Sequence, residues 1–205
     1  TAQAEALAAG GADLLWIETM SSLEEIKAAI EAAAAVGLPA ATCMTFDTAA
    51  RSMMGITPAD FASQSTAFGA AYIGANCGIG PAELLHSVSK ILVDAKVPVI
   101  AKGNCGIPAY VDGAIHYHGT PELMAAYACL ARDAGVTIIG GCCGTTEVHV
   151  RAMRTALESV PRRPFDQEAA DAALGVAWKD VPTPDNAGDT KQSTGRRRGR
   201  RRDRG

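Results

Sequence analysis

The 205-residue chain is predicted to be an α/β protein of the (β/α)₈ TIM barrel type, of which it holds five β/α units. Apolar runs of strand length alternate with helical segments roughly every 30 residues, which implies a parallel sheet with right-handed crossovers. The strand candidates are continuously apolar, as expected where both faces of a sheet are buried. Residues suited to chemistry repeatedly follow these strands, as they do at the catalytic end of a barrel.

The number of units predicts a partial barrel. A complete (β/α)₈ barrel takes about 250 residues. This chain begins at Thr1, immediately before an expected helix at residues 2–9. We therefore expect an N-terminally truncated fragment that contains the last five units. Such a fragment would expose sheet edges and would be unstable or inactive alone. An open parallel sheet fits the same pattern, whereas the lack of GxGxxG after a first strand disfavours dinucleotide binding.

Each element has its own sequence signal. The five strands are expected at residues 13–18, 39–46, 71–75, 97–101 and 136–139. The helices are expected at residues 22–36, 57–68, 81–95, 121–134 and 147–159. Serine or threonine can cap four of them, namely Ser21 or Ser22, Thr57, Thr120, and Thr145 or Thr146. Gly37 ends the helix at residues 22–36, and a long loop is expected from Gly103 to Gly119.

Composition divides the chain into three parts. Residues 1–160 form the expected barrel domain, residues 161–182 a proline-interrupted extension with a short helix at 166–174, and residues 183–205 a disordered tail. Residues 195–205 contain seven arginines and one aspartate, whereas the whole chain carries a net charge of −3. The tail permits a noncatalytic, RNA-associated function through phosphate attraction. It lacks interleaved aromatic residues and a folded reader module, so a nucleic-acid partner is not expected.

Cysteine usage and hydropathy indicate the compartment. The chain has six cysteines without the spacing of a small secreted scaffold, which is typical of a reducing compartment where thiols are free or bind metal. No apolar run reaches the roughly 18 residues of a membrane span, and no signal peptide is recognisable. We expect a cytoplasmic protein without a membrane partner, and homo-oligomerisation stays open.

The most informative motif is Gly140-Gly-Cys142-Cys143-Gly-Thr-Thr146, between the last strand and a helix. Neighbouring side chains of a strand point to opposite faces, so both thiols reach one metal only if glycines bend the backbone there. Cys77 follows another strand. Three thiolates at strand ends would make an open zinc site with a fourth position for substrate. A strained vicinal disulfide is the alternative for the adjacent pair.

Two segments together, Gly74-Ala-Asn-Cys77-Gly and Gly140-Gly-Cys142-Cys143-Gly-Thr-Thr146, resemble the zinc-dependent homocysteine S-methyltransferases. The likeness extends over residues 12–156 and is greatest to the bacterial betaine–homocysteine enzymes. The homocysteine module of cobalamin-dependent methionine synthase is also similar. The family fold is a (β/α)₈ barrel, in agreement with the strand and helix pattern.

The resemblance implies a role for each of these residues. Cys77, Cys142 and Cys143 match the zinc ligands, and Glu18 matches the carboxylate that holds the homocysteine amino group. A helix cap or an ion pair is the alternative for Glu18. Asn76 and Asn104 follow strands, and each is expected either to bind the substrate carboxylate or to fix a loop.

The chemistry that the resemblance implies is methyl transfer to a thiol. A free thiol has a pKa of about 8.5, and zinc at the open position would ionise the homocysteine thiol. That thiolate can attack a methyl group of a cationic donor, for which betaine is the first expectation, to give methionine. Animal betaine enzymes place an aromatic residue after the matched carboxylate, but Thr19 stands here. A cobalamin-domain DxHxxG motif does not occur in the chain.

Overall fold

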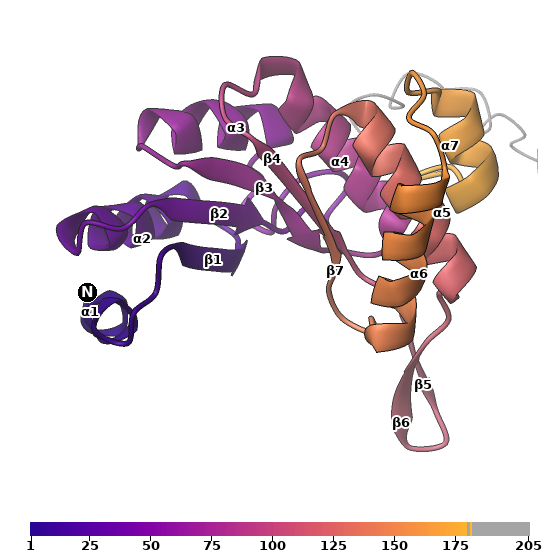
Figure 1. Ribbon diagram of the computed structural model, residues 1–205, viewed down its shortest axis with the longest axis horizontal. Coiled ribbons are helices and arrows are strands. Elements are labelled where there is room, and N and C mark those ends of the chain that lie inside the picture. Colours follow the sequence, from indigo (N-terminus) through magenta and orange to yellow (C-terminus); the bar gives the residue numbers. More distant parts are fainter. Residues whose placement is uncertain (180, 182–205) are drawn as a thin grey trace, which may run out of the picture.

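A five-stranded, all-parallel sheet forms the centre of the protein in the computed structural model, which describes residues 1–179 and 181 (Figure 1). Its strands lie in the spatial order β1-β2-β3-β4-β7. They are β1 (Leu15–Met20), β2 (Ala40–Met44), β3 (Tyr72–Cys77), β4 (Val99–Gly103) and β7 (Ile138–Gly141). Among the described residues, β1 and β7 are therefore the two edges of this sheet.

The strand order is that of a barrel wall. The connecting helices are α2 (Leu23–Ala35), α3 (Pro58–Ala67), α4 (Pro81–Asp94) and α5 (Pro121–Ala134), with α6 (Glu147–Ser159) after the last strand and α1 (Ala2–Ala9) before the first. Each new strand of the sheet is added on the same side as the one before, without the reversal that defines a doubly wound sheet. Right-handed crossovers then place these helices on one face. The predicted α/β barrel class is confirmed, as five consecutive β/α units.

The two faces of the sheet bury different clusters. The larger core lies between the sheet and the helices and includes Ile26, Phe61, Ile73, Val88 and Met124. A second, small cluster contains Ala41, Cys43 and Ile100 from β2 and β4, with no helical residue among its buried members. This face corresponds to the interior of a barrel, and we call it the inner face.

Helix caps agree with the prediction in most places. Ser22 and Glu25 form a capping box on α2, and Thr57 and Thr120 accept hydrogen bonds from the first turns of α3 and α5. Thr146, and not Thr145, precedes α6.

Four expected strands, those at residues 13–18, 71–75, 97–101 and 136–139, were placed one or two residues too early along the chain. β3 continues to Cys77 and β4 to Gly103, and these two residues pair with each other. β7 continues to Gly141, which pairs with Gly103 on the opposite edge of β4. The extra residues of β3, β4 and β7 are Asn76, Cys77, Lys102, Gly103, Gly140 and Gly141. All of them except Cys77 belong to residue types with low intrinsic strand preference. Pairing with neighbouring strands, which the sequence alone does not show, extends the ladder through them.

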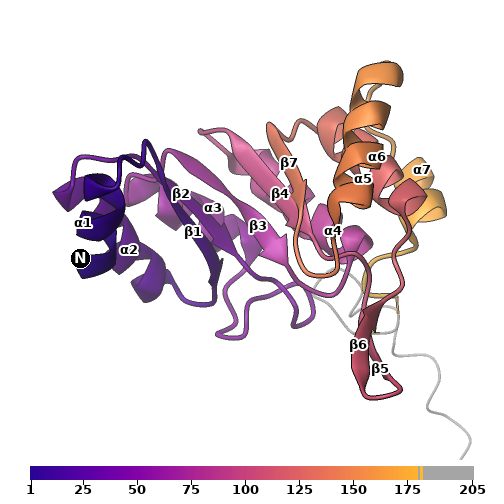
Figure 2. The ribbon, with the colours of Figure 1, turned by 60° about the horizontal axis from the view of Figure 1, so that its bottom comes forward.

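The expected long loop from Gly103 to Gly119 was wrong. It contains an antiparallel hairpin of β5 (Pro108–Val111) and β6 (Ala114–Tyr117), which projects from the body (Figures 1 and 2). Asp112 and Gly113 form its two-residue turn with φ of 50° and 83°. An Asp-Gly pair between short apolar runs is a known hairpin signal, so the sequence did contain this information.

The segment after residue 160 packs onto the body. Helix α7 (Gln167–Leu174), capped by Asp166, lies against α4 and α5, and Ala170 and Trp178 are buried. The proposed domain boundaries at 160 and 182 stay predictions. The Arg-rich tail, residues 183–205, lies outside the described residues. None of the helices in the described part combines the length and hydrophobicity needed to cross a membrane.

Candidate metal centre

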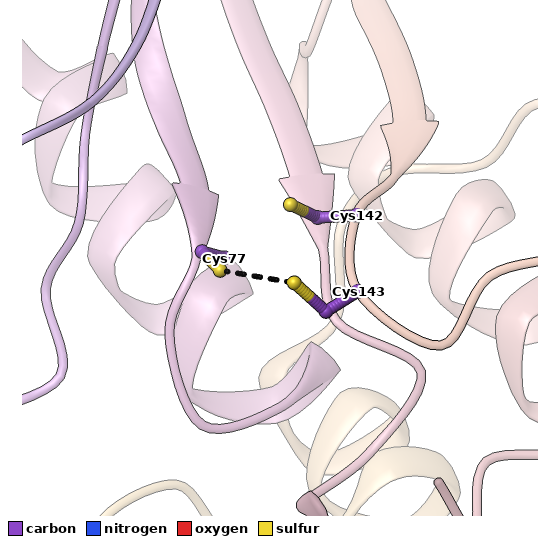
Figure 3. A group of neighbouring side chains, drawn as sticks. All are labelled: Cys77, Cys142 and Cys143. Carbon is purple, nitrogen blue, oxygen red and sulfur yellow. Dashed lines mark hydrogen bonds between the residues drawn. The ribbon is translucent and has the colours of Figure 1, made fainter. Parts of the chain in front are cut away.

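Three thiols converge at the carboxyl ends of two strands that flank β4 (Figure 3). Cys77 is the last residue of β3, and Cys142 and Cys143 directly follow β7. Their Sγ atoms all lie within 4.8 Å of one another, and the Sγ atoms of Cys77 and Cys143 are 3.6 Å apart. The structure therefore brings together the three predicted ligands, from segments 65 residues apart in the chain.

The geometry of the thiols fits zinc. Zn–S bonds of about 2.3 Å in a tetrahedral arrangement separate two sulfurs by about 3.8 Å. The Cys77–Cys143 separation of 3.6 Å is close to this value and far from the roughly 2.05 Å of a disulfide. All six cysteines are free thiols. Three sulfur donors leave one tetrahedral position for another ligand, as in a catalytic zinc site.

The backbone bends at both cysteine segments. Cys77 has φ of 63°, unusual for a residue with a side chain. Gly144, with φ of 78°, supplies the corresponding bend after Cys143. Gly140 and Gly141 were expected to serve the same purpose but do not have positive φ values. Gly141 instead provides space, because a Cβ there would lie 2.2 Å from Oγ1 of Thr145.

Asn104, directly after β4, ties the two cysteine segments together. Its side-chain Oδ1 accepts a hydrogen bond from the backbone N–H of Cys143 at 3.0 Å, and its Nδ2 donates to the carbonyl of Gly78 at 2.6 Å. The backbone N–H of Cys105 adds a bond to the carbonyl of Cys143 at 2.9 Å. Asn104 is 4% exposed. These contacts correspond to the loop-fixing alternative for Asn104.

Asn76 lies within β3 and is fully buried. Its Oδ1 accepts from the backbone N–H of Thr19 at 2.8 Å, and its Nδ2 lies 2.9 Å from Oγ1 of Thr19. The same Nδ2 is 3.8 Å from Sγ of Cys142. Thr19 has φ of 62° at a register break in β1. Asn76 thus links this bend to one of the thiols.

Burial and neighbouring thiols raise the pKa of the Cys77 thiol to about 12. Burial is the largest cause, followed by the charge on Cys142 and a hydrogen bond with Cys143. The protonated form of Cys77 is therefore favoured in the metal-free protein. A metal ion that binds here has to displace protons, so its affinity depends on pH.

Glu18 lies within β1 and has two protein partners. It forms an ion pair with Nζ of Lys102 on β4 and accepts a hydrogen bond from Nε1 of Trp16 at 2.6 Å. Nζ of Lys102 also lies 5.4 Å from the centre of the Trp16 ring. The ion-pair alternative for Glu18 is therefore present in the structure.

Lys102 was not among the residues predicted for the site. The sequence feature that could have indicated its role is its position as the only charged residue in the apolar stretch Val99-Ile-Ala-Lys102. A charged residue in a buried strand requires a partner, but the sequence does not show which one.

The parallel β/α sheet and the three clustered thiols at its carboxyl edge define an α/β domain of the barrel type with a candidate metal site. The sequence profile described as homocysteine S-methyltransferase matches residues 1–157, and the chain belongs to this family. It is 29% identical over 185 residues to a methionine synthase of Mycobacterium tuberculosis and 31% identical over 155 residues to that of Mycobacterium leprae. These matches cover 87% and 72% of the chain but only 15% and 13% of the two relatives.

A solved structure has the same fold. The homocysteine methyltransferase MmuM of Escherichia coli, in its apo form, superposes with a TM-score of 0.61 and 25% identity. The match covers 74% of this chain and 52% of the solved chain. A metallated form of MmuM gives the same TM-score and identity and covers 47% of the solved chain. The chain thus spans about half of this structural relative.

Proposed function

We propose that this protein holds zinc through Cys77, Cys142 and Cys143 and methylates the thiol of homocysteine to give methionine. The observation that supports this most strongly is the convergence of three thiols within 4.8 Å at the carboxyl edge of the sheet. Family membership adds the acceptor, because the matching profile is named for homocysteine methyl transfer. Zinc, when bound, supplies Lewis acidity that lowers the pKa of a substrate thiol below its usual value of about 8.5.

The residues of the chain orient the acceptor. Glu18 holds the α-ammonium group of homocysteine on the inner face, next to the thiol centre. Asn104 and Asn76 keep the cysteine segments in place through the hydrogen bonds described above. A fixed position for the thiol relative to the methyl group makes in-line transfer effectively unimolecular, which can contribute several kcal/mol to the rate.

Betaine is the methyl donor that we propose first. A quaternary ammonium group suits an anionic site, since zinc with three thiolates has a net charge of −1. The ring of Tyr117 supports this donor, because it packs against Gly144, beside Cys143, and an aromatic face attracts such a cation. The Trp16 ring already has Lys102 within 5.4 Å.

A cobalamin-bound methyl group is the second candidate donor. It is favoured by the two mycobacterial relatives, both of which are methionine synthases. Single-turnover assays with betaine and with methylcobalamin, each with homocysteine, separate the candidates. Methionine from betaine without cobalamin supports the first donor, and methionine from methylcobalamin alone supports the second.

Zinc content tests the centre itself. Replacement of Cys142 and Cys143 by alanine together should abolish stoichiometric zinc and methyl transfer. Cys129→Ala is the matched control, because Cys129 lies on helix α5 and is not one of the three clustered thiols. Stoichiometric zinc in the double variant would contradict the proposed ligands.

A further inference from the structure

The ion pair between Glu18 and Lys102 crosses the inner face of the sheet. β1 and β4 are separated by β2 and β3, so in a flat sheet the two strands would lie about 14 Å apart. The side chains nevertheless meet. The sheet therefore curves toward this face, and the pair lies on its concave side.

Both partners belong to the inner face by strand alternation. Ile100 is part of the inner cluster, and Lys102 lies two residues further along the same strand. On β1, Leu15 and Ile17 pack into the helix-side core, which leaves Trp16 and Glu18 on the opposite side. The Glu18 and Lys102 side chains are 27% and 25% exposed, so a ligand can reach both charges.

Strand register places the backbone of Lys102 close to that of Cys142. Lys102 pairs in register with Gly140, and Cys142 follows two residues later, which corresponds to about 7 Å along the strand. Four bonds separate the sulfur of homocysteine from its α-ammonium nitrogen, a span of about 5 Å when extended. A thiol at the metal centre would therefore bring the α-carbon substituents to the Glu18–Lys102 pair.

Gly140 leaves room for the lysine. A Cβ at this position would lie 3.3 Å from Cγ of Lys102, so the aliphatic part of Lys102 packs over the first glycine of the Gly-Gly-Cys-Cys motif. The metal-binding motif and the lysine are thus neighbours in the fold, and the motif backbone helps to orient the ammonium group.

We propose that Lys102 binds the α-carboxylate of homocysteine while Glu18 binds its α-ammonium group, so that the substrate zwitterion inserts into the ion pair. This inference rests on the proposed function and deepens it. Opposite charges alternate in the resulting complex, and each hydrogen bond joins two charged groups, which makes it stronger than a neutral one. A thiol without the α-carboxylate leaves Lys102 without a partner when the ion pair separates, and a thiol without the α-ammonium group leaves Glu18 without one. The pair therefore selects amino-acid thiols over simple thiols.

The test compares three thiols by calorimetric binding to the zinc-loaded protein. Homocysteine has both charges, 3-aminopropane-1-thiol lacks the carboxylate, and 4-sulfanylbutanoate lacks the ammonium group. Lys102→Met should weaken homocysteine and 4-sulfanylbutanoate roughly tenfold or more without weakening the aminothiol. Glu18→Gln should give the opposite pattern, with weaker homocysteine and aminothiol but unchanged 4-sulfanylbutanoate.

Controls separate this role from a structural one. Lys27→Met removes a lysine of helix α2 that pairs with Glu31 and should change none of the three affinities. Lys102→Gln keeps most of the stem over Gly140 and gives the same comparison if Lys102→Met does not fold. An equal loss for all three thiols in the Lys102 variants, or no loss, overturns the inference. If the unmodified zinc-loaded protein does not bind homocysteine, the proposed function fails, and the inference fails with it.

Discussion

The packing of Gly144 against Tyr117 gives a quantitative prediction about how the hairpin and the metal centre depend on each other. Gly144 has φ of 78°, and a Cβ added there would lie 2.2 Å from Cγ and 2.5 Å from Cβ of Tyr117. The Gly144→Ala substitution therefore has two separate costs. The backbone conformation costs about 1–2 kcal/mol, and the overlap with the tyrosine costs about 1–3 kcal/mol.

The hairpin turn offers a matched control. Gly113 has φ of 83°, and a Cβ there would meet no atom within 4 Å. Gly113→Ala should lose only the backbone share, about 1–2 kcal/mol. The difference between the two variants then measures the overlap alone. Urea unfolding of both variants gives the two free energies of unfolding.

The zinc affinities of the same two variants test whether the overlap at Gly144 also disturbs the metal centre. Relief of the overlap has to move either Tyr117 or the segment that carries Cys143. We expect Gly144→Ala to bind zinc at least tenfold more weakly in a chelator competition, since changes next to the ligands typically cost 10–100-fold. Gly113→Ala should bind zinc as the unmodified protein does. Equal free energies of unfolding and equal zinc affinities for the two variants would show that the contact between Gly144 and Tyr117 does not couple the hairpin to the metal centre.

Three further predictions concern single side chains. Asn104→Ala removes the link to the backbone N–H of Cys143 and should cost about 1–3 kcal/mol of unfolding free energy, together with a roughly 10- to 100-fold loss of zinc affinity by chelator competition; unchanged affinity would contradict the link. Cys105→Ala should lower the melting temperature, because Cys105 is fully buried, but keep stoichiometric zinc by atomic absorption. The third is a pH dependence. Burial, and to a lesser extent the charge on Glu18, raises the pKa of the Cys43 thiol well above its usual range. The folded thiol therefore stays protonated where the unfolded one ionises, and its stabilising contribution falls as pH rises above about 9. Cys43→Ala should make the fall in unfolding free energy between about pH 9 and 11 shallower by up to about 1.4 kcal/mol per pH unit; an unchanged slope in urea unfolding would contradict this.

The order of the sheet strands and their connecting helices, and the identity of the three clustered cysteines, could be predicted from the sequence alone. Alternating apolar runs and capping residues such as Ser22 and Thr120 are local signals, and local signals can be read one segment at a time. The Asp112-Gly113 turn was equally local, and the hairpin was predictable from it. The cysteines were recognisable because adjacent thiols among glycines do not suit a regular strand.

The contacts between side chains that are distant in the sequence depend on the tertiary structure. Lys102 and Glu18 are 84 residues apart, and their contact depends on the curvature of a sheet that two intervening strands complete. Asn76 and Asn104 follow apolar runs in the same way, so the sequence left a substrate contact and a loop contact equally open for both. Partners across a sheet are set by register and curvature, which arise when all strands pair together, and no single segment encodes them.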